Sequence, residues 1–397
     1  MKTIRSNHLA LMVAAITALA PFGIDAYLPA IPALASHLGA SIHLTSTSIS
    51  IFLVGFAFGQ LVFGPLSDRI GRRPVLIFGT LVFMAACIGL VFVSSLEMLW
   101  VLRFVQAIGG GACVVNSSAI VRDRFSGQDA ARVFSTMVMI LMLAPLVAPT
   151  LGSVLLYMQG WQLVFGFLFL YALLVLLIVV FFLPETRQRP QHPPSALMVI
   201  KHYGEVLTHR AAVGYMLAVA MSFAGMFAFI TSSPYVYMGY YHVSPALYPV
   251  LFGANIVVMA GSNQLNIRLL KHVAARKIMK VGLAIQLVTA ALLVLCIVLG
   301  IDRLWMVVIL VMLFVGTLGL VSANATSNML DFFPHMSATA NAVQGSIQFT
   351  AGALSGGLLG ALGQKGVLPM AFMMMITALL ANVLVRWLSE RRMKNRQ

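Results

Sequence analysis

Two ionisable side chains lie inside long apolar stretches near the start of the chain. The stretch FGIDAYLPAIP, residues 22–32, carries one carboxylate, Asp25, between residues 6–24 and 26–67, which contain no Asp, Glu, Lys or Arg. Arg103 lies inside a second apolar stretch, LWVLRFVQAIGGG. Because a buried charge is costly unless it is paired or faces a cavity, the two residues indicate either a structural ion pair or a proton-binding site.

The composition indicates what surrounds these two residues. Of the 397 residues, 60% are hydrophobic and only 9% are charged, with a mean hydropathy of +0.97; soluble domains carry about 25% charged residues. Apolar stretches of roughly 20 residues, long enough to cross a bilayer, recur along the whole chain. We predict twelve spanning helices: two each within 1–67, 133–184 and 211–267, and one each within 74–96, 104–121, 281–301, 304–330, 332–364 and 366–385.

The predicted fold is therefore an all-α integral membrane protein. The apolar stretches lack the alternation of polar and apolar residues that barrel strands require. We place turns at Gln159-Gly160-Trp161 and near residues 242–245, and a polar separator, SHLGASIHLTSTS, at residues 36–48. Cys87, Cys113 and Cys296 all fall inside predicted spans, so the sequence indicates no disulfide framework.

The net charge of +15 reflects topology. All basic residues except Arg103, Arg303 and Lys365 fall at the two ends or in alternate loops. By the positive-inside rule this set and both termini face the cytoplasm, which predicts a multi-pass membrane protein. The basic residues are not interleaved with stacking aromatic residues, which argues against nucleic acid as a partner.

Helix geometry allows Asp25 and Arg103 to meet. A first helix running outward from about residue 8 places Asp25 roughly 25 Å along its axis. A fourth helix running inward from about Leu99 places Arg103 about 6 Å below the outer surface. Both then lie in the outer half of a layer about 30 Å thick. Burial stabilises the protonated form of an aspartate, and a nearby guanidinium stabilises the charged form. A change in the burial of Asp25 or in the position of Arg103 would therefore change whether Asp25 binds a proton.

A polar, proline-rich stretch divides the chain. Residues 184–210 form a predicted cytoplasmic linker between two halves, 1–183 and 211–397, of six helices each. DRIGRRP follows the second predicted helix, and IRLLKHVAARK, residues 267–277, follows the eighth at the matching place. Two halves with corresponding loops are typical of transporters that bind their substrate between repeats.

The loop after the second helix contains several residues with special properties. GPLSDRIGRRPVL, residues 64–76, includes two glycines, one carboxylate and three arginines: Gly64, Gly71, Asp68, Arg69, Arg72 and Arg73. We expect the glycines to permit a tight turn, the aspartate to cap a helix and the arginines to hold the loop at the inner face. The preceding Gly55 and Gly59 present a small face to a neighbouring helix.

The motifs resemble those of major facilitator transporters. GPLSDRIGRRPVL matches their loop motif, G-x-L-x-D-R-x-G-R-R/K-x-x-L. LRFVQAIGGG, residues 102–111, is similar to R-x-x-Q-G-x-G, with Ala107 in place of a glycine. APLVAPTLGS, residues 144–153, is similar to the antiporter motif G-x-x-x-G-P-x-x-G-G through Pro149 and Gly152, with Ala or Ser at three glycine positions. Together with DAYLPAIP, VRDRF and DFFPHM, these motifs resemble the Bcr/CflA branch of drug:proton antiporters.

The resemblance implies roles for five residues. Asp68 would pack against the N-terminus of the eleventh helix and lock the outward-open state, with Arg73 and Asp123 in the same network. Asp25 matches the proton-coupling carboxylate, and Arg103 matches the membrane-embedded arginine that communicates with it.

The fifth helix should rock against its neighbours. Pro145 and Pro149 remove two backbone donors from it, and Gly152 keeps one face small. Alternating access requires such movement.

Substrate contacts are expected from aromatic, methionine and neutral amide side chains, which suit an uncharged or weakly polar compound. The same residue types also pack against lipid or other helices. The candidates are Tyr27, Asn116, Met226, Phe229, Tyr235, Asn255, Asn324, Asn328, Gln344 and Gln348.

The resemblance implies proton-driven efflux of small drugs, of the bicyclomycin or chloramphenicol kind, by a transporter that acts as a monomer. Its partners would be protons and the substrate, with no cofactor and no metal. Two transport alternatives stay open: export of a physiological metabolite such as an amino acid or thiol, and proton-coupled nutrient symport. The short loops argue against a receptor or scaffold. The absence of HExxH and Ser-His-Asp patterns argues against an enzyme.

Overall fold

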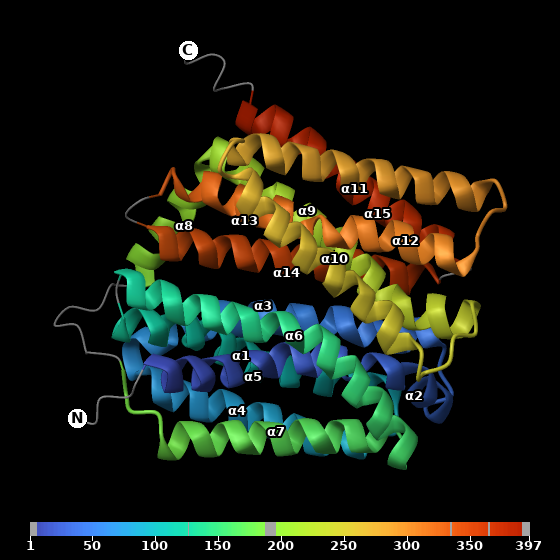
Figure 1. The fold of residues 1–397 in the computed structure, drawn as a ribbon. Coiled ribbons are helices and arrows are strands. Elements are labelled where there is room, and N and C mark those ends of the chain that lie inside the picture. Colours follow the sequence, from blue (N-terminus) through green and yellow to red (C-terminus); the bar gives the residue numbers. More distant parts are fainter. Residues whose placement is uncertain (1–5, 126, 187–195, 334–335, 364–365, 391–397) are drawn as a thin grey trace. The chain divides into compact units, whose positions relative to one another are not determined.

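The computed structural model describes residues 6–125, 127–186, 196–333, 336–363 and 366–390. Every regular element among these residues is a helix (Figure 1). The central part of the predicted linker, 187–195, lies outside the described residues, as do Pro334 and His335 of the DFFPHM motif.

The chain divides into two compact units, Met1–Pro193 with Ser244–Pro249, and Pro194–Val243 with Val250–Gln397. The first unit contains α1 (Ser6–Asp25), η1 (Leu28–Ala30), α2 (Ile31–His37), α3 (Ile42–Ile70), α4 (Arg72–Val91), α5 (Leu96–Arg124), α6 (Gly127–Gln159) and α7 (Trp161–Phe181). The second contains α8 (Ala196–Thr208), α9 (Arg210–Ser233), η2 (Pro234–Tyr240), most of α10 (Tyr248–Leu269), α11 (Ala275–Val298), α12 (Leu304–Gly316), α13 (Leu318–Leu330), α14 (Ser337–Leu362), α15 (Leu368–Leu384) and η3 (Val385–Glu390). The division into halves at 184–210 stays a prediction.

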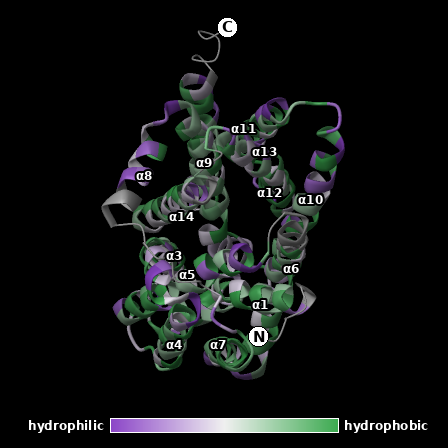
Figure 2. Ribbon diagram, turned by 90° about the vertical axis from the view of Figure 1, so that its left-hand side faces the viewer, coloured by the Kyte–Doolittle hydropathy of each residue, from purple (hydrophilic) through white to green (hydrophobic). Residues whose placement is uncertain are grey.

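Within the described residues, ten segments are long and apolar enough to cross a membrane. Four of them join consecutive elements: His8–His37, Arg210–Tyr240, Leu304–Leu330 and Leu368–Ser389. The long helices α6 and α14, of 33 and 26 residues, are the other two predicted spans. Figure 2 shows hydrophobic residues along most of the helices. The predicted all-α membrane fold with twelve spanning helices is confirmed.

Several helices extend beyond the apolar stretches that predicted them. α5 runs from Leu96 to Arg124, and α4 begins at Arg72. α3 begins at Ile42, inside the stretch that we predicted to be a polar separator. The Ser41 hydroxyl accepts the Leu44 N–H at 3.3 Å and so caps this helix. Polar residues therefore start α3, because their hydroxyl groups bond to its backbone.

The two predicted turns are confirmed. α6 ends at Gln159 and α7 begins at Trp161, with Gly160 between them at a φ of +88°. The second turn separates η2 from α10, and His242 adopts a positive φ of 54° there.

The first spanning segment is interrupted directly after Asp25. α1 ends at this residue, and the chain continues through η1 into α2. Pro29 lies in η1 and Pro32 lies at the start of α2, where a missing N–H costs little. The prolines near Asp25 thus mark a break in the helix, which leaves the carboxylate at a helix end inside the protein.

Close packing of α3 on α5 depends on glycine. A Cβ atom added at Gly55 would lie 2.5 Å from the Phe104 carbonyl oxygen, and one at Gly59 would lie 2.5 Å from that of Ile108. On α5, a Cβ at Gly111 would lie 2.5 Å from the Phe56 carbonyl oxygen. The small face predicted for this helix is confirmed.

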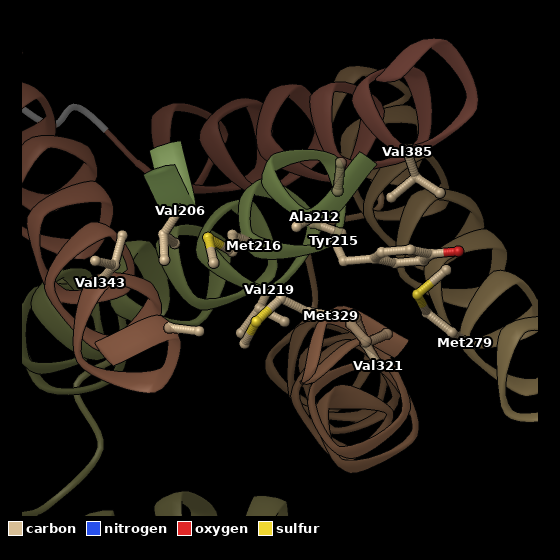
Figure 3. Packing of buried hydrophobic residues seen from close by; sticks show 14 of the residues in the cluster. Val206, Ala212, Tyr215, Met216, Val219, Met279, Val321, Met329, Val343 and Val385 are labelled. Atoms are coloured by element: carbon tan, nitrogen blue, oxygen red, sulfur yellow. The ribbon is translucent and has the colours of Figure 1, made fainter. Parts of the chain in front are cut away.

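The second unit packs around α9. Figure 3 shows Met216 and Val219 of α9 surrounded by apolar side chains from other helices of the unit. These include Met279 of α11 and Met329 of α13, both fully buried. At least some of the chain's many methionines therefore fill a core, where their flexible side chains adapt to irregular gaps.

The glycine contacts of α3 predict a selective effect on stability. Gly59→Ala should lower the free energy of unfolding by about 1–3 kcal/mol, because its new methyl group would overlap backbone. Gly166→Ala in α7 is the matched control, since nothing lies within 4 Å of a Cβ there. Thermal unfolding of the purified variants in detergent measures the effect. Equal melting temperatures for both variants would contradict the packing.

Candidate functional site

Asp25 is a buried carboxylate at the end of α1. Its side chain is 6% exposed. It makes no hydrogen bond or ion pair to any residue that the structure describes. A carboxylate in this position can gain or lose a proton without first breaking a contact with another side chain.

Arg103 of α5 is fully buried and lies against α1 and α3. Its Nη1 atom donates to the Gly23 carbonyl oxygen at 2.8 Å and to Gln106 Oε1 at 2.6 Å. Its guanidinium carbon lies 4.7 Å from the ring centre of Tyr27 and 4.5 Å from that of Phe52. The two rings stabilise the buried charge through cation–π interaction. The Nε and Nη2 atoms have no hydrogen-bond partner among the described residues.

The direct contact between Asp25 and Arg103 that helix geometry allows is not formed in this structure. Arg103 instead reaches the backbone of Gly23, two residues before Asp25 on the same helix. Aromatic rings pack on the guanidinium, and its Nη1 atom donates to two uncharged oxygens. The Arg103 side chain is thus joined to the backbone of α1.

Gln106 explains the spacing of the R-x-x-Q motif. It lies three residues after Arg103 on α5, so both side chains share one face of the helix. Its Oε1 accepts from Arg103, and its Nε2 donates to Cys87 Sγ at 3.1 Å. Gln106 holds the arginine, a role that our list of candidate residues did not include.

Tyr27, a predicted substrate contact, is fully occupied by packing in this structure. Its ring lies beside Arg103 and 5.5 Å from the ring of Phe165. Its hydroxyl accepts from Ser48 Oγ at 3.2 Å. These contacts support a positioning role beside Arg103, and its contact with substrate stays a prediction.

The helix with the antiporter-like motif, α6, passes directly beside the Asp25 segment. A Cβ atom at Gly152 would overlap the carbonyl oxygen of Ala26, the residue after Asp25. Pro149 is buried and Pro145 is half-buried, and both lie inside one continuous helix. The small residue at 152 therefore allows α6 to approach the site. The rocking of this helix stays a prediction.

Arg72 organises the loop motif, where α3 and α5 end and α4 begins. Its guanidinium contacts Asp68 Oδ1 at 2.7 Å and Asp123 Oδ2 at 3.0 Å. Its Nη1 also donates to Ser67 Oγ at 2.6 Å. The resemblance implies that Arg73 belongs to the same network as Asp68 and Asp123. Its guanidinium donates to the carbonyl oxygens of Val179 and Val180 at the end of α7, and the side chain that contacts both carboxylates is that of Arg72.

Glu185 is a member of this network that the sequence analysis missed. Its two carboxylate oxygens accept the backbone N–H groups of Arg72 and Arg73, at 3.0 and 3.1 Å. These are the first two residues of α4, where free N–H groups and the helix dipole favour an anion. The sequence signal for this role of Glu185 is an acidic residue that directly follows the apolar run of α7 and is surrounded by basic residues.

Two expectations about the loop glycines and Asp68 are corrected by these contacts. Gly64 lies inside α3, which continues to Ile70, so only Gly71 forms the turn, with a φ of +110°. Asp68 pairs with Arg72, and it is Glu185 that caps α4. Arg69 is exposed. Whether Asp68 locks one state stays a prediction.

In the second unit, Phe229 lies near the end of α9, Tyr235 lies in η2, and Asn255 lies in the first half of α10. The Phe229 ring lies 5.9 Å from those of Tyr237 and Phe252. Asn255, three residues after Phe252, donates from Nδ2 to the Phe252 carbonyl oxygen at 2.9 Å. The Tyr235 hydroxyl accepts the Gly366 N–H at 3.2 Å.

A second group of candidates joins α10, α13 and α14. Asn324 Nδ2 donates to Asn266 Oδ1 at 2.7 Å, and Asn328 Nδ2 donates to the Asn324 carbonyl oxygen at 2.6 Å. Gln344 Nε2 donates to Thr326 Oγ1 at 2.7 Å. Most of these amide donors therefore stabilise helix pairs. Met226 and Gln348 are half-buried.

Comparisons with known proteins agree with the fold and the motifs. The family profile described as Major Facilitator Superfamily matches residues 13–357. A bicyclomycin resistance protein homolog of Haemophilus influenzae is 35% identical over 95% of both chains. A chloramphenicol resistance protein of Pseudomonas aeruginosa is 33% identical over 69% of this chain and 65% of its own length. The xylose transporter XylE of E. coli shares the fold, with a TM-score of 0.72 at 16% identity over 95% and 97% of the two chains.

The chain belongs to the Major Facilitator Superfamily. It is a multi-pass membrane transporter for small molecules and not an enzyme.

The Glu185 contacts predict faster amide exchange when its charge is removed. Glu185→Gln should raise the hydrogen-exchange rates of the Arg72 and Arg73 amides at least about five-fold, because an uncharged amide accepts more weakly. Glu205→Gln, at an exposed site on α8, is the control. Unchanged exchange at the start of α4 in Glu185→Gln would rule out the cap.

The Arg103 contacts predict that lysine cannot replace it. Arg103→Lys keeps the charge but loses the planar group that stacks on Tyr27 and Phe52, so stability should fall by about 2 kcal/mol. Arg386→Lys, at an exposed position in η3, should have little effect. Thermal unfolding in detergent compares them. Melting of Arg103→Lys at the wild-type temperature would contradict the stacking.

Proposed function

We propose that this transporter exports small drugs of the bicyclomycin or chloramphenicol kind in exchange for protons. The resistance activities in the names of two relatives support the substrate class. The observation that carries the proton part is Asp25: a buried carboxylate without an ion-pair partner among the described residues, at a break in a spanning helix. Breaks of this kind are where secondary transporters place their ion sites.

In the proposed cycle, Asp25 binds a proton when the site opens outward and releases it when the site opens inward. Substrate from the cytoplasm competes with the protonated state. Arg103 donates a hydrogen bond to the Gly23 carbonyl oxygen, so movement of the end of α1 that carries Asp25 changes the contacts of Arg103. Gly152 lets α6 follow that movement at Ala26.

The Arg72 network would set which side of the protein is open. Arg72 of α4 pairs with Asp68 of α3 and with Asp123 of α5, so movement of α4 away from both helices would break two ion pairs. The Asp68 side chain is 41% exposed, and ion pairs with exposed partners contribute only about 0–1 kcal/mol, which suits a contact that must form and break in each cycle.

We also propose the location, the oligomeric state and the energy source of the transporter. The protein acts as a monomer in the bacterial inner membrane, with both termini in the cytoplasm. The chain consists of two six-helix halves, 1–183 and 211–397, joined by residues 184–210. The proton gradient supplies the free energy, so transport requires no cofactor or metal.

Replacement of Asp25 tests the coupling. In everted vesicles with an acidic interior, bicyclomycin or chloramphenicol should dissipate the pH gradient when wild-type protein is present. Asp25→Asn should abolish this dissipation, because an amide cannot carry the proton. A pH-sensitive dye reports the gradient.

Glu97→Gln, at an exposed site in the first turn of α5, is the matched control and should retain wild-type exchange. Drug-driven proton movement that persists in Asp25→Asn would exclude this residue as the proton carrier. A gradient that no drug affects, with solute moving inward in whole cells, would favour nutrient symport.

A further inference from the structure

A histidine caps the start of α9. His209 is the N-cap residue of this helix, and its Nδ1 atom accepts the Ala212 N–H at 3.3 Å. The His209 side chain is half-buried, and Ala212 is fully buried. Because the backbone N–H donates this hydrogen bond, the Nδ1 atom that faces it carries no proton. The cap therefore requires the uncharged form of His209.

The same ring joins three segments of the second unit. Its centre lies 4.7 Å from the ring centre of Phe332 and 5.5 Å from that of Phe333, both of which follow α13. The two phenylalanines pack in or against the buried cluster around α9, to which Val206 of α8 also belongs (Figure 3). His209 thus links the end of α8, the start of α9 and the DFFPHM motif.

Protonation of His209 would break the cap for two reasons. An imidazolium ring has a donor on each nitrogen and no acceptor, so the hydrogen bond from Ala212 is lost. Its positive charge would also lie at a helix N-terminus, where the helix dipole disfavours cations. Contact with Phe332 stabilises a charged ring. This contact does not involve Nδ1, so the protonated ring can stay on the phenylalanines while the start of α9 is uncapped.

The helices around His209 carry other ionisable groups. Helix α14, which packs on α8 and α9, contains none. Those of α8, α9, η3 and the residue after α13 are Lys201, His202, Tyr203, Glu205, Arg210, Tyr215, Asp331, Arg386 and Glu390. Among the described residues, the His209 ring makes no hydrogen bond, ion pair or ring contact with any of them. Protonation of His209 itself is therefore the change that opens the cap.

We propose that His209 is a pH-sensitive cap that slows export when the cytoplasm becomes acidic. This inference rests on the proposed export function and on the proposed cytoplasmic position of the segment between the halves. Histidine changes its charge between about pH 5 and 8. The cap is formed at the upper end of this range, and it opens as the pH falls. Export then slows because α9, which carries the predicted substrate contacts Met226 and Phe229, is no longer fixed at its start.

Such a response would suit a transporter that exchanges its substrate for protons. Each exchange brings a proton into the cytoplasm. A cap that opens on acidification would limit further proton entry. Asp25 cannot supply this response on its own, because it belongs to the exchange and lies in the other unit.

Amide hydrogen exchange of the purified full-length protein in detergent tests the cap without transport. The rate at Ala212 is divided by its intrinsic rate at about pH 7.5 and about pH 5.5, near the two ends of the histidine range. Wild type should lose protection about 3- to 10-fold at the lower pH, the effect of one lost cap. His209→Asn should be equally protected at both, because asparagine caps helices and does not titrate.

Two further variants complete the exchange experiment. His209→Ser supplies a second side chain that caps without titrating, and it serves if the asparagine variant does not fold. His202→Asn is the matched control. His202 is a half-buried histidine inside α8 that caps no helix, so this variant should lose protection at Ala212 as wild type does.

Everted vesicles test the regulation, because the bath then sets the pH at the proposed cytoplasmic face. Proton movement driven by chloramphenicol is measured as the bath pH is lowered, with the size of the pH gradient held constant. His209→Asn should match wild type at about pH 7.5. At about pH 6 it should be at least about 3-fold faster, because it keeps its cap.

Three results would contradict the proposal, and they differ. Equal protection of Ala212 at both pH values in wild type, or the same loss in His209→Asn, would exclude a pH-sensitive cap. A cap that opens with no difference in transport between wild type and His209→Asn would exclude the regulatory role, and export stands. If no drug moves protons at any pH, export and its regulation both fail, while the exchange result still decides whether the cap responds to pH.

Discussion

The interaction on which the first unit depends is the stabilisation of a guanidinium that is fully buried in apolar surroundings. A charge at such a place costs at least about 2.5–3.5 kcal/mol unless other groups compensate it. Arg103 receives this compensation from the Gly23 carbonyl, the Gln106 amide and the rings of Tyr27 and Phe52. The glycine face of α3 allows Phe52 to come this close, because α3 can then lie directly on α5. The break after Asp25 leaves the carboxylate free while Arg103 binds its helix.

The same physical rule operates with charged partners at the loop motif, where α3 meets α4. Arg72 bridges two carboxylates, and Glu185 covers the N-terminus of α4. These contacts tie the end of α7 to the loop motif, because Arg73 also bonds to the last turn of that helix. The loop motif therefore joins four helix ends, those of α3, α5 and α7 and the start of α4. The helices α3 and α5 each contribute to both groups of contacts, α3 through Phe52 and Asp68 and α5 through Arg103 and Asp123.

The spanning helices could be predicted from the sequence because runs without charge leave a membrane helix as the only stable state. Helix ends could not, since α3 starts on Ser and Thr residues whose hydroxyl groups bond to its own backbone. Asp25 and Arg103 were identifiable as isolated charges, yet their separation was not, because it depends on which rings pack on the guanidinium. Spacing alone does not show that Arg72 and not Arg73 contacts both carboxylates, or that Glu185 caps α4. Both contacts depend on the direction of side chains at a turn.

The central claim is that Asp25 exchanges a proton when substrate binds. Purified transporter in weakly buffered detergent solution tests it directly, with a glass electrode or pH dye that counts protons as chloramphenicol is added. Wild type should release protons as it binds chloramphenicol, and Asp25→Asn should bind without release. Binding without release by wild type, or unchanged release by the variant, would contradict it.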